Sequence, residues 1–175
     1  TPGRVAVLCH PHPLYGGRME DPVLDAVAEA LLARGATCLR FNFRGVGGSE
    51  GAFDDGRGES ADAAAAARWL VGRHPGATLL PVGYSFGALA AWRAAAELAG
   101  ASAIERVLLV APPVTLLDFG NARPRDVAVD VFTGVEPDPS IDVFETAVER
   151  ARDAGADVVV GVGGGSTLDV TKTTS

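Results

Sequence analysis

The chain has 175 residues, of which 47% are hydrophobic and 21% charged, a composition typical of a folded domain rather than a disordered one. Its formal net charge of −7 argues against a nucleic-acid partner, because phosphate binding needs a basic surface. No stretch approaches the roughly 20 uninterrupted apolar residues of a membrane span, so we expect no membrane partner. The length fits one domain covering residues 1–175.

The first two thirds of the chain alternate apolar runs of strand length with helical patterns. We predict strands at 4–9, 37–43, 78–83 and 106–112, and helices at 21–35, 59–73 and 86–100. The first helix carries clear end signals, with Asp21 at its N-cap, Pro22 in its first turn and Gly35 at its stop. Its apolar side chains are predicted to share one face: Val23, Leu24, Val27, Leu31 and Leu32.

The same alternation resumes after an interruption at 121–125. We predict a strand at 127–132, a helix at 139–155, a strand at 157–162 and a final helix cut off at residue 175. Six continuously apolar strands separated by helices indicate an α/β fold, a three-layer sandwich with a mostly parallel sheet. Because the chain starts without Met or a leader and stops inside a helix, we interpret it as a fragment.

The stretch GYSFG at 83–87 has the G-x-S-x-G spacing between a predicted strand and a predicted helix. This context is typical of a nucleophile elbow, in which a strained turn presents a catalytic serine. Ser85 is then the nucleophile, and the backbone amide of Phe86 is one donor to the oxyanion. The alternative is a tight turn in which Ser85 only caps the following helix.

Four stretches together resemble α/β-hydrolase-fold proteins of the dienelactone hydrolase and esterase type. They are HPHPLYGG at 10–17, LRFNFRGVGGSEG at 39–51, GYSFGA at 83–88 and VLLVAPPVTLLDF at 107–119, so the resemblance covers about 4–119. It implies a serine hydrolase acting on an ester or related acyl group of a small-molecule substrate. It also implies that the loop around Leu14 and Tyr15 supplies a second oxyanion amide.

A serine nucleophile needs a histidine base, which an acid orients. The resemblance places the acid after the strand at 127–132, where Glu136 and Asp138 are candidates, and we choose Asp138. It places the histidine after the last strand, but glycine and serine stand there, and no histidine follows His74. His10 and His12 remain alternatives for the base. We therefore expect impaired activity.

The stretch VGVGGGSTLDVTK at 160–172 carries different chemistry. Together with the preceding strand and helix it resembles the nucleotide-binding part of iron-containing (group III) alcohol dehydrogenases, over about 125–175. The resemblance implies an NAD(P) site whose residues include Gly164, Gly165, Ser166 and Asp169. Glycine amides at a helix start suit a pyrophosphate, although such a turn can also merely pack a helix on a strand. The hydrolase interpretation needs no cofactor, and we predict no metal ligands.

The two resemblances indicate a chimera of a hydrolase-like part and a dehydrogenase-like part. Three hypotheses follow: an impaired serine hydrolase, an NAD(P)-binding fragment, or an inactive structural chimera. Cys9 and Cys38 lie in apolar runs without metal-binding spacing, which favours reduced thiols and a cytoplasmic location. An exposed sheet edge favours a homodimer.

Overall fold

The computed structural model describes residues 3–104, 106–113, 116–119, 145–146 and 149. The chain divides into two units, Thr1–Val127 and Ala128–Ser175. In the second unit, Glu145, Thr146 and Glu149 are helical and exposed, inside the helix predicted at 139–155. The strands predicted at 127–132 and 157–162 lie outside the described residues.

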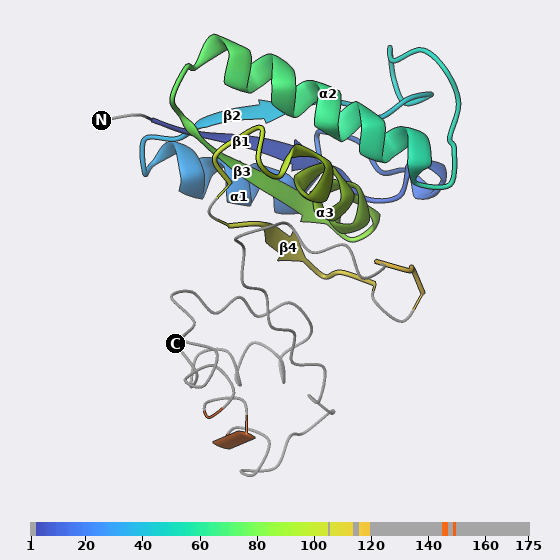
Figure 1. The fold of residues 1–175 in the computed structure, drawn as a ribbon. Coiled ribbons are helices and arrows are strands. Elements are labelled where there is room, and N and C mark those ends of the chain that lie inside the picture. The colour runs from blue at the N-terminus through green and yellow to red at the C-terminus, as the bar shows by residue number, and fades with distance from the viewer. Residues whose placement is uncertain (1–2, 105, 114–115, 120–144, 147–148, 150–175) are drawn as a thin grey trace. The chain divides into compact units, whose positions relative to one another are not determined.

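The first unit is a parallel sheet covered by helices (Figure 1). Its elements are β1 (Arg4–Cys9), the 3₁₀ helix η1 (Pro13–Tyr15), α1 (Pro22–Leu32), β2 (Thr37–Arg40), α2 (Arg57–Arg73), β3 (Thr78–Tyr84), α3 (Phe86–Leu98) and β4 (Leu108–Val110). The strand order is β2-β1-β3-β4, and each neighbouring pair is parallel. The predicted α/β fold is confirmed, and η1 is an addition to the predicted elements.

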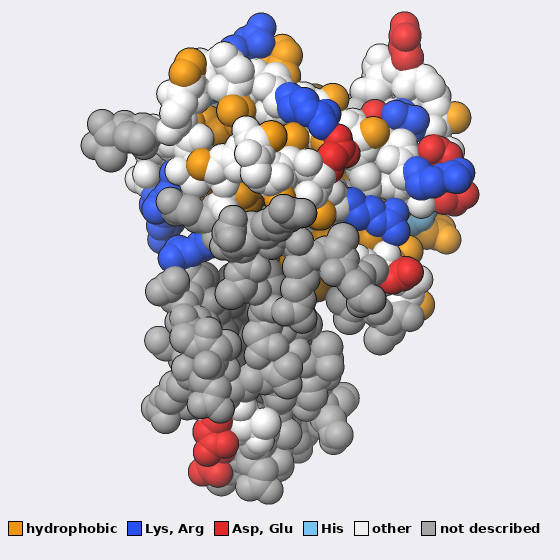
Figure 2. All heavy atoms as spheres, viewed as in Figure 1, with side chains coloured by type: hydrophobic (Ala, Val, Ile, Leu, Met, Phe, Trp, Pro, Cys, Tyr) orange, Lys and Arg blue, Asp and Glu red, His pale blue; other side chains and the backbone are white. Residues whose placement is uncertain are grey.

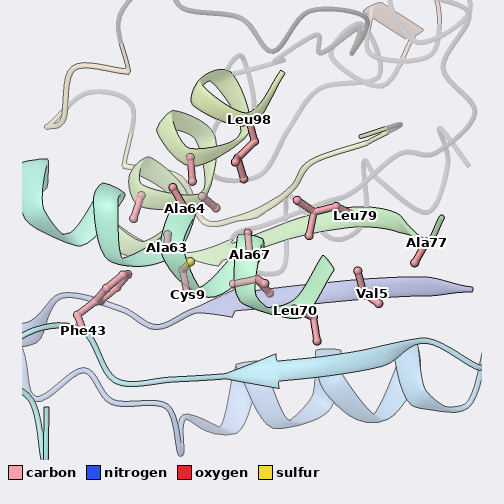
Figure 3. Packing of buried hydrophobic residues seen from close by; sticks show 14 of the residues in the cluster. Val5, Cys9, Phe43, Ala63, Ala64, Ala67, Leu70, Ala77, Leu79 and Leu98 are labelled. Carbon is pink, nitrogen blue, oxygen red and sulfur yellow. The ribbon is translucent and has the colours of Figure 1, made fainter. Parts of the chain in front are cut away.

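Two apolar layers enclose the sheet, and β1 contributes to both. Val5, Val7 and Cys9 pack with residues of α2 and α3 on one face, as Figure 3 shows for Val5 and Cys9. Ala6 and Leu8 pack with α1 on the other face. After the exposed Arg4, the side chains of β1 are buried on both faces and form a continuous apolar run, as expected for the interior of a parallel sheet.

Small side chains bring α2 and α3 close to the sheet. Ala63, Ala64 and Ala67 of α2 are buried in the same cluster as Ala90 and several neighbours on α3. An alanine adds little bulk and loses no side-chain entropy when it is buried. The alanine-rich sequence of α2 is therefore both a strong helix former and a close-packing surface.

In the described part of the chain, no helix is long and apolar enough to cross a membrane.

Three details differ from the sequence-based expectation. Leu32 is 55% exposed, because it lies in the last turn at the margin of the apolar stripe, whereas Ala28 is buried. β2 ends at Arg40, and three residues later the Phe43 N–H donates to the side chain of His10 rather than to a strand. β4 ends at Val110, because Ala111 adopts a positive φ of 45°.

The long loop between β2 and α2 is tied to the start of α2 by two acidic residues. Arg44 donates to Asp62 from its backbone N–H and from its guanidinium, with nitrogen–oxygen distances of 2.8–3.1 Å. Burial alone would raise the pKa of Asp62, but these hydrogen bonds outweigh burial and lower it. Glu59 is fully buried and accepts hydrogen bonds from the N–H groups of Asp54 and Gly56.

Replacing Glu59 by alanine should destabilise the first unit. The substitution leaves two N–H groups without their acceptor, so we expect Glu59→Ala to lower the free energy of unfolding by about 2–4 kcal/mol. Glu50→Ala, in the same loop but exposed, should change it by less than about 0.5 kcal/mol. Urea unfolding followed by tryptophan fluorescence measures both, since Trp69 and Trp92 lie in this unit. Equal losses in the two variants would contradict the role of Glu59.

Candidate active site

The strand order has a switch point at the carboxyl edge of the sheet, between β1 and β3. β1 is followed along the chain by its neighbour β2, whereas β3 pairs with the opposite side of β1. The loops that leave β1 and β3 therefore diverge from adjacent points, and ligands of open α/β sheets bind at such points. η1 follows β1 there, and Ser85 follows β3. Figure 2 shows histidine surface at this end of the unit, among hydrophobic, acidic and basic side chains.

Ser85 has a backbone conformation that is rare outside glycine. Its φ is 54° and its ψ is −120°, and its side chain makes no capping hydrogen bond with α3. The turn is held through its backbone: the Ser85 N–H donates to the Val110 carbonyl at 2.8 Å, and the Ser85 carbonyl accepts from the Ala88 N–H at 2.9 Å. The geometry gives no support to the alternative that Ser85 serves as a helix cap.

Gly83 and Gly87 make this turn possible. A Cβ atom at Gly83 would lie 2.2 Å from the Gly87 carbonyl oxygen, so only glycine lets β3 and α3 approach so closely. A Cβ atom at Gly87 would lie 2.2 Å from the carbonyl oxygen of Cys9 and 2.5 Å from that of His10. The serine turn is thus packed directly against the backbone at the end of β1.

Replacing Gly87 by alanine should therefore be severe. The clash is with backbone atoms, which cannot rotate away, so we expect Gly87→Ala to lower the free energy of unfolding by about 3 kcal/mol. Gly72→Ala is the matched control, because Gly72 also lies in a helix and a Cβ atom there meets no other atom within 4 Å. We expect the control to be neutral or more stable by about 0.5 kcal/mol. Urea unfolding of both variants tests the prediction, and a Gly87→Ala protein as stable as the control would refute it.

His10 is a buried structural histidine. Its side chain is fully buried, its Nε2 accepts from the Phe43 N–H at 3.0 Å, and its Nδ1 donates to the Pro11 carbonyl at 2.7 Å. These bonds require a neutral ring with its proton on Nδ1. Burial lowers the pKa of His10, and this outweighs the opposing effects of the Pro11 carbonyl, Asp21 and Glu20. In this geometry His10 has no free ring nitrogen to accept the proton of Ser85.

His12 lies at the start of η1 and is surrounded by aromatic rings. Its Nδ1 accepts from the Leu14 N–H at 3.2 Å. Its ring centroid lies 4.7–4.9 Å from those of Tyr15, Phe53 and Phe86. Burial lowers the pKa of His12, although the negative charges of Glu59 and Asp55 oppose this. The ring is therefore neutral near pH 7, with its proton on Nε2.

His74 lies away from the serine. It is the C-cap residue of α2 and precedes β3, so it stands at the amino edge of the sheet, whereas Ser85 stands at the carboxyl edge.

The two predicted oxyanion amides differ in their present partners. The Leu14 side chain is 67% exposed, and its N–H is already bonded to His12. Phe86 is the first residue of α3 and is buried, and among the described residues its N–H has no acceptor. The His12 side chain links both predicted donors, because its Nδ1 accepts from the Leu14 N–H and its ring contacts the Phe86 ring.

Phe43 and Phe53 are site residues that the sequence analysis missed. The Phe43 ring lies 4.5 Å from the His10 ring and 6.0 Å from the Phe86 ring, and the Phe53 ring lies 5.6 Å from the Phe86 ring, between centroids. Phe53 is a lone aromatic residue within the polar stretch SEGAFDDG, and this isolation is the sequence feature that could have identified it as a site residue.

A cavity of about 420 Å³ lies beside η1, lined by Pro13 and by residues 16–18 and 45–47. Arg18 is the charged side chain in this lining. Asn42 is bonded to residues that follow the two lining segments, because Asn42 Oδ1 accepts from the Met19 N–H at 2.8 Å and its backbone carbonyl accepts from the Ser49 hydroxyl. The predicted acid Asp138 and the predicted nucleotide-binding residues lie outside the described residues: Gly164, Gly165, Ser166 and Asp169.

A parallel sheet with a serine turn after β3, beside the loop that follows β1, defines the α/β-hydrolase fold. Comparison with known families agrees. A profile described as X-Pro dipeptidyl-peptidase (S15 family) matches residues 1–120, and one described as iron-containing alcohol dehydrogenase matches residues 81–175. Each covers more than half of the chain. The chain therefore belongs to the first family through its hydrolase-like part and to the second through residues 81–175.

Two of the similar solved structures are described as an α/β serine hydrolase and a homologue of one. An α/β serine hydrolase without a lid from Xanthomonas campestris is 42% identical, with a TM-score of 0.64 over 69% of this chain and 53% of its own. An α/β serine hydrolase homologue from Coxiella burnetii is 40% identical, with a TM-score of 0.57 over 63% of this chain and 51% of its own. An uncharacterised protein of Rickettsia prowazekii is 44% identical over 74% of this chain and 55% of its own length. The chain thus spans about half the length of these relatives.

The two family matches overlap over residues 81–120, which include Ser85 and α3. The dehydrogenase-like region therefore reaches further towards the N-terminus than the expected start at 125. Both families use parallel strand–turn–helix units, so β3, its glycine turn and α3 are compatible with either. The resemblance to α/β-hydrolase-fold proteins and to iron-containing alcohol dehydrogenases, expected from the sequence, is confirmed.

Proposed function

We propose that this chain is the nucleophile-bearing part of a serine hydrolase that acts on an ester or related acyl group of a small-molecule substrate. The observation that carries the proposal is the conformation of Ser85, with a positive φ and no capping bond, at the switch point between β1 and β3. Non-glycine residues in such conformations cluster at active sites. The similarity to serine hydrolases from two bacteria supports the same conclusion.

In the proposed reaction, Ser85 Oγ attacks the acyl carbon and loses its proton to a solvent water molecule. The Oγ–C bond forms, the bond from carbon to the leaving oxygen breaks, and the leaving alcohol takes up the proton. The Phe86 N–H stabilises the negative oxygen of the intermediate. Its effect is reinforced by the 13-residue helix α3, whose N-terminus carries partial positive charge. Water then releases the acyl group.

We further propose that turnover by this chain is slow. His10 uses both ring nitrogens, His12 uses its Nδ1 within η1, and His74 lies at the opposite edge of the sheet. A positioned general base contributes typically 10²–10⁴ in rate, so its absence leaves a weakly activated serine. Asp138 remains the proposed acid of a complete site.

A fluorophosphonate probe tests the nucleophile directly. We expect slow covalent labelling of the chain, over hours rather than seconds, with the modification mapped to Ser85 by peptide mass spectrometry. Ser85→Ala should abolish the labelling, because Ser85 is the residue of this turn with the positive φ that presents a nucleophile.

Ser49→Ala serves as the control, since the Ser49 hydroxyl only donates to the Asn42 carbonyl, and it should label at the wild-type rate. Labelling that persists in Ser85→Ala, or that maps to other serines, would overturn the proposed nucleophile.

The match to iron-containing alcohol dehydrogenases favours a second function, nucleotide binding by residues 163–166, for which the sequence predicts a glycine turn. Glycine amides at a helix start would contact the pyrophosphate of NAD(P). Within the described residues no three His, Cys, Asp or Glu side chains group as a metal site, and we assign no step to iron.

A titration with NADH and NADPH, followed by cofactor fluorescence, tests this second function. We expect saturable binding that Gly164→Val weakens at least tenfold, because the valine side chain blocks the approach of a phosphate to the backbone. A Thr174→Val variant, outside the glycine turn, should bind like the wild type. The absence of saturable binding, or binding that Gly164→Val leaves unchanged, would eliminate nucleotide binding.

A cytoplasmic location and a homodimer also belong to the proposal. The free thiols of Cys9 and Cys38 agree with a reducing compartment. Among the described strands β2 is an edge strand with one partner, which agrees with pairing between copies of the chain.

A further inference from the structure

The turn that contains η1 keeps its own N–H groups occupied. Tyr15 and Gly17 both donate to the His12 carbonyl, at 3.1 and 3.0 Å, and Gly16 donates to the Pro13 carbonyl at 3.3 Å. Leu14 differs, because its N–H is held by a side chain, the Nδ1 of His12. A side-chain acceptor can move without unfolding the turn, so Leu14 is the one donor of this turn that can be exchanged.

The ring of His12 is held in position from three sides. Tyr15 belongs to η1, Phe53 to the loop before α2, and Phe86 to the start of α3, and all three rings contact it. Phe86 is also the residue whose amide has no acceptor among the described residues. His12 therefore bonds to one predicted oxyanion amide and packs on the residue that provides the other.

We propose that His12 is a positioning residue of the oxyanion hole, whose Nδ1 holds the Leu14 N–H in the resting turn and gives it up to the negative oxygen that forms on the acyl group. This inference rests on the proposed serine hydrolase function. It assigns to His12 a role other than that of the general base.

The exchange favours the transition state over the bound substrate. A neutral carbonyl oxygen offers the Leu14 N–H about the same hydrogen bond as the imidazole nitrogen, so the exchange gains little on substrate binding. A negatively charged oxygen accepts roughly twice as strong a bond. Leu14 would therefore change partners as the charge develops, and an interaction made only at that stage accelerates the reaction.

The same arrangement makes the Leu14 bond dependent on pH. Protonation places a hydrogen on Nδ1, and the ring can then no longer accept from Leu14. The charged groups acting on the ring are Glu59 of α2 and Asp55 of the preceding loop, and Tyr15 of η1 is its titratable ring contact, while α3 contributes the Phe86 ring. Burial lowers the pKa of His12, so the bond persists at neutral pH and is lost only on acidification.

Amide hydrogen exchange of the whole 175-residue chain, measured by NMR, tests the bond itself. We expect the protection factor of the Leu14 amide to fall about tenfold as His12 protonates, with the ring state followed by its own nitrogen shifts. The Gly17 amide is the internal control, because its acceptor is the His12 carbonyl, and its protection should not follow the ring.

Two variants separate position from titration. In His12→Asn the side-chain oxygen can accept from Leu14 without titrating, so protection should remain at acid pH. In His12→Phe the Leu14 amide should lack protection at every pH. Leu14 protection that is independent of His12 protonation in the wild type would overturn the inference, even if His12→Phe fails to fold.

The role in the reaction is tested by fluorophosphonate labelling across the same pH range. The ratio of the wild-type rate to the His12→Asn rate should change at least threefold across the titration of His12, and a constant ratio would overturn the positioning role. A different outcome would refute the proposed function instead. If the wild type shows no labelling of Ser85 while protection of the Leu14 amide still follows His12 protonation, the hydrolase function fails, and with it the assignment of Leu14 as an oxyanion donor.

Discussion

The contact between the first turn of α3 and the end of β1 is the constraint on which the site depends. The Cβ atoms that Gly83 and Gly87 lack would lie 2.2 Å from backbone atoms, so any other residue would push β3, α3 and β1 apart. This close crossing lets the chain turn sharply from β3 into α3 and holds Ser85 at a positive φ. It also packs the serine turn against the end of β1, as the proposed oxyanion hole requires.

Around that contact, polar bonds and aromatic rings hold the loops at the carboxyl edge. His10 joins the end of β1 to the residues after β2 by accepting a hydrogen bond from the Phe43 N–H, and Glu59 and Asp62 fasten the long loop to α2. That loop in turn places Phe53 against His12 and Phe86. Among the described residues, Trp92 Nε1 is the buried side-chain N or O atom without a hydrogen bond, so the polar groups that hold these loops are satisfied.

Much of this fold was predictable from the sequence, because continuous apolar runs and end signals such as Asp21 and Pro22 report local structure directly. The serine turn was predictable for a similar reason, since glycine spacing between a strand and a helix has few explanations. The different roles of His10 and His12 were not predictable from the sequence. They depend on the Phe43 and Leu14 amides, which only the folded chain brings to those rings. The buried Glu59 was equally hidden, as its partners lie in an irregular loop.

A crystal structure of the chain with a phosphonate ester bound covalently is the most direct test of the account. The account predicts a bond between Ser85 Oγ and phosphorus, with a phosphoryl oxygen 2.7–3.1 Å from the amide nitrogens of both Phe86 and Leu14, and with the Leu14 N–H no longer bonded to His12. An adduct on another residue, or an oxygen that contacts neither amide, would contradict it.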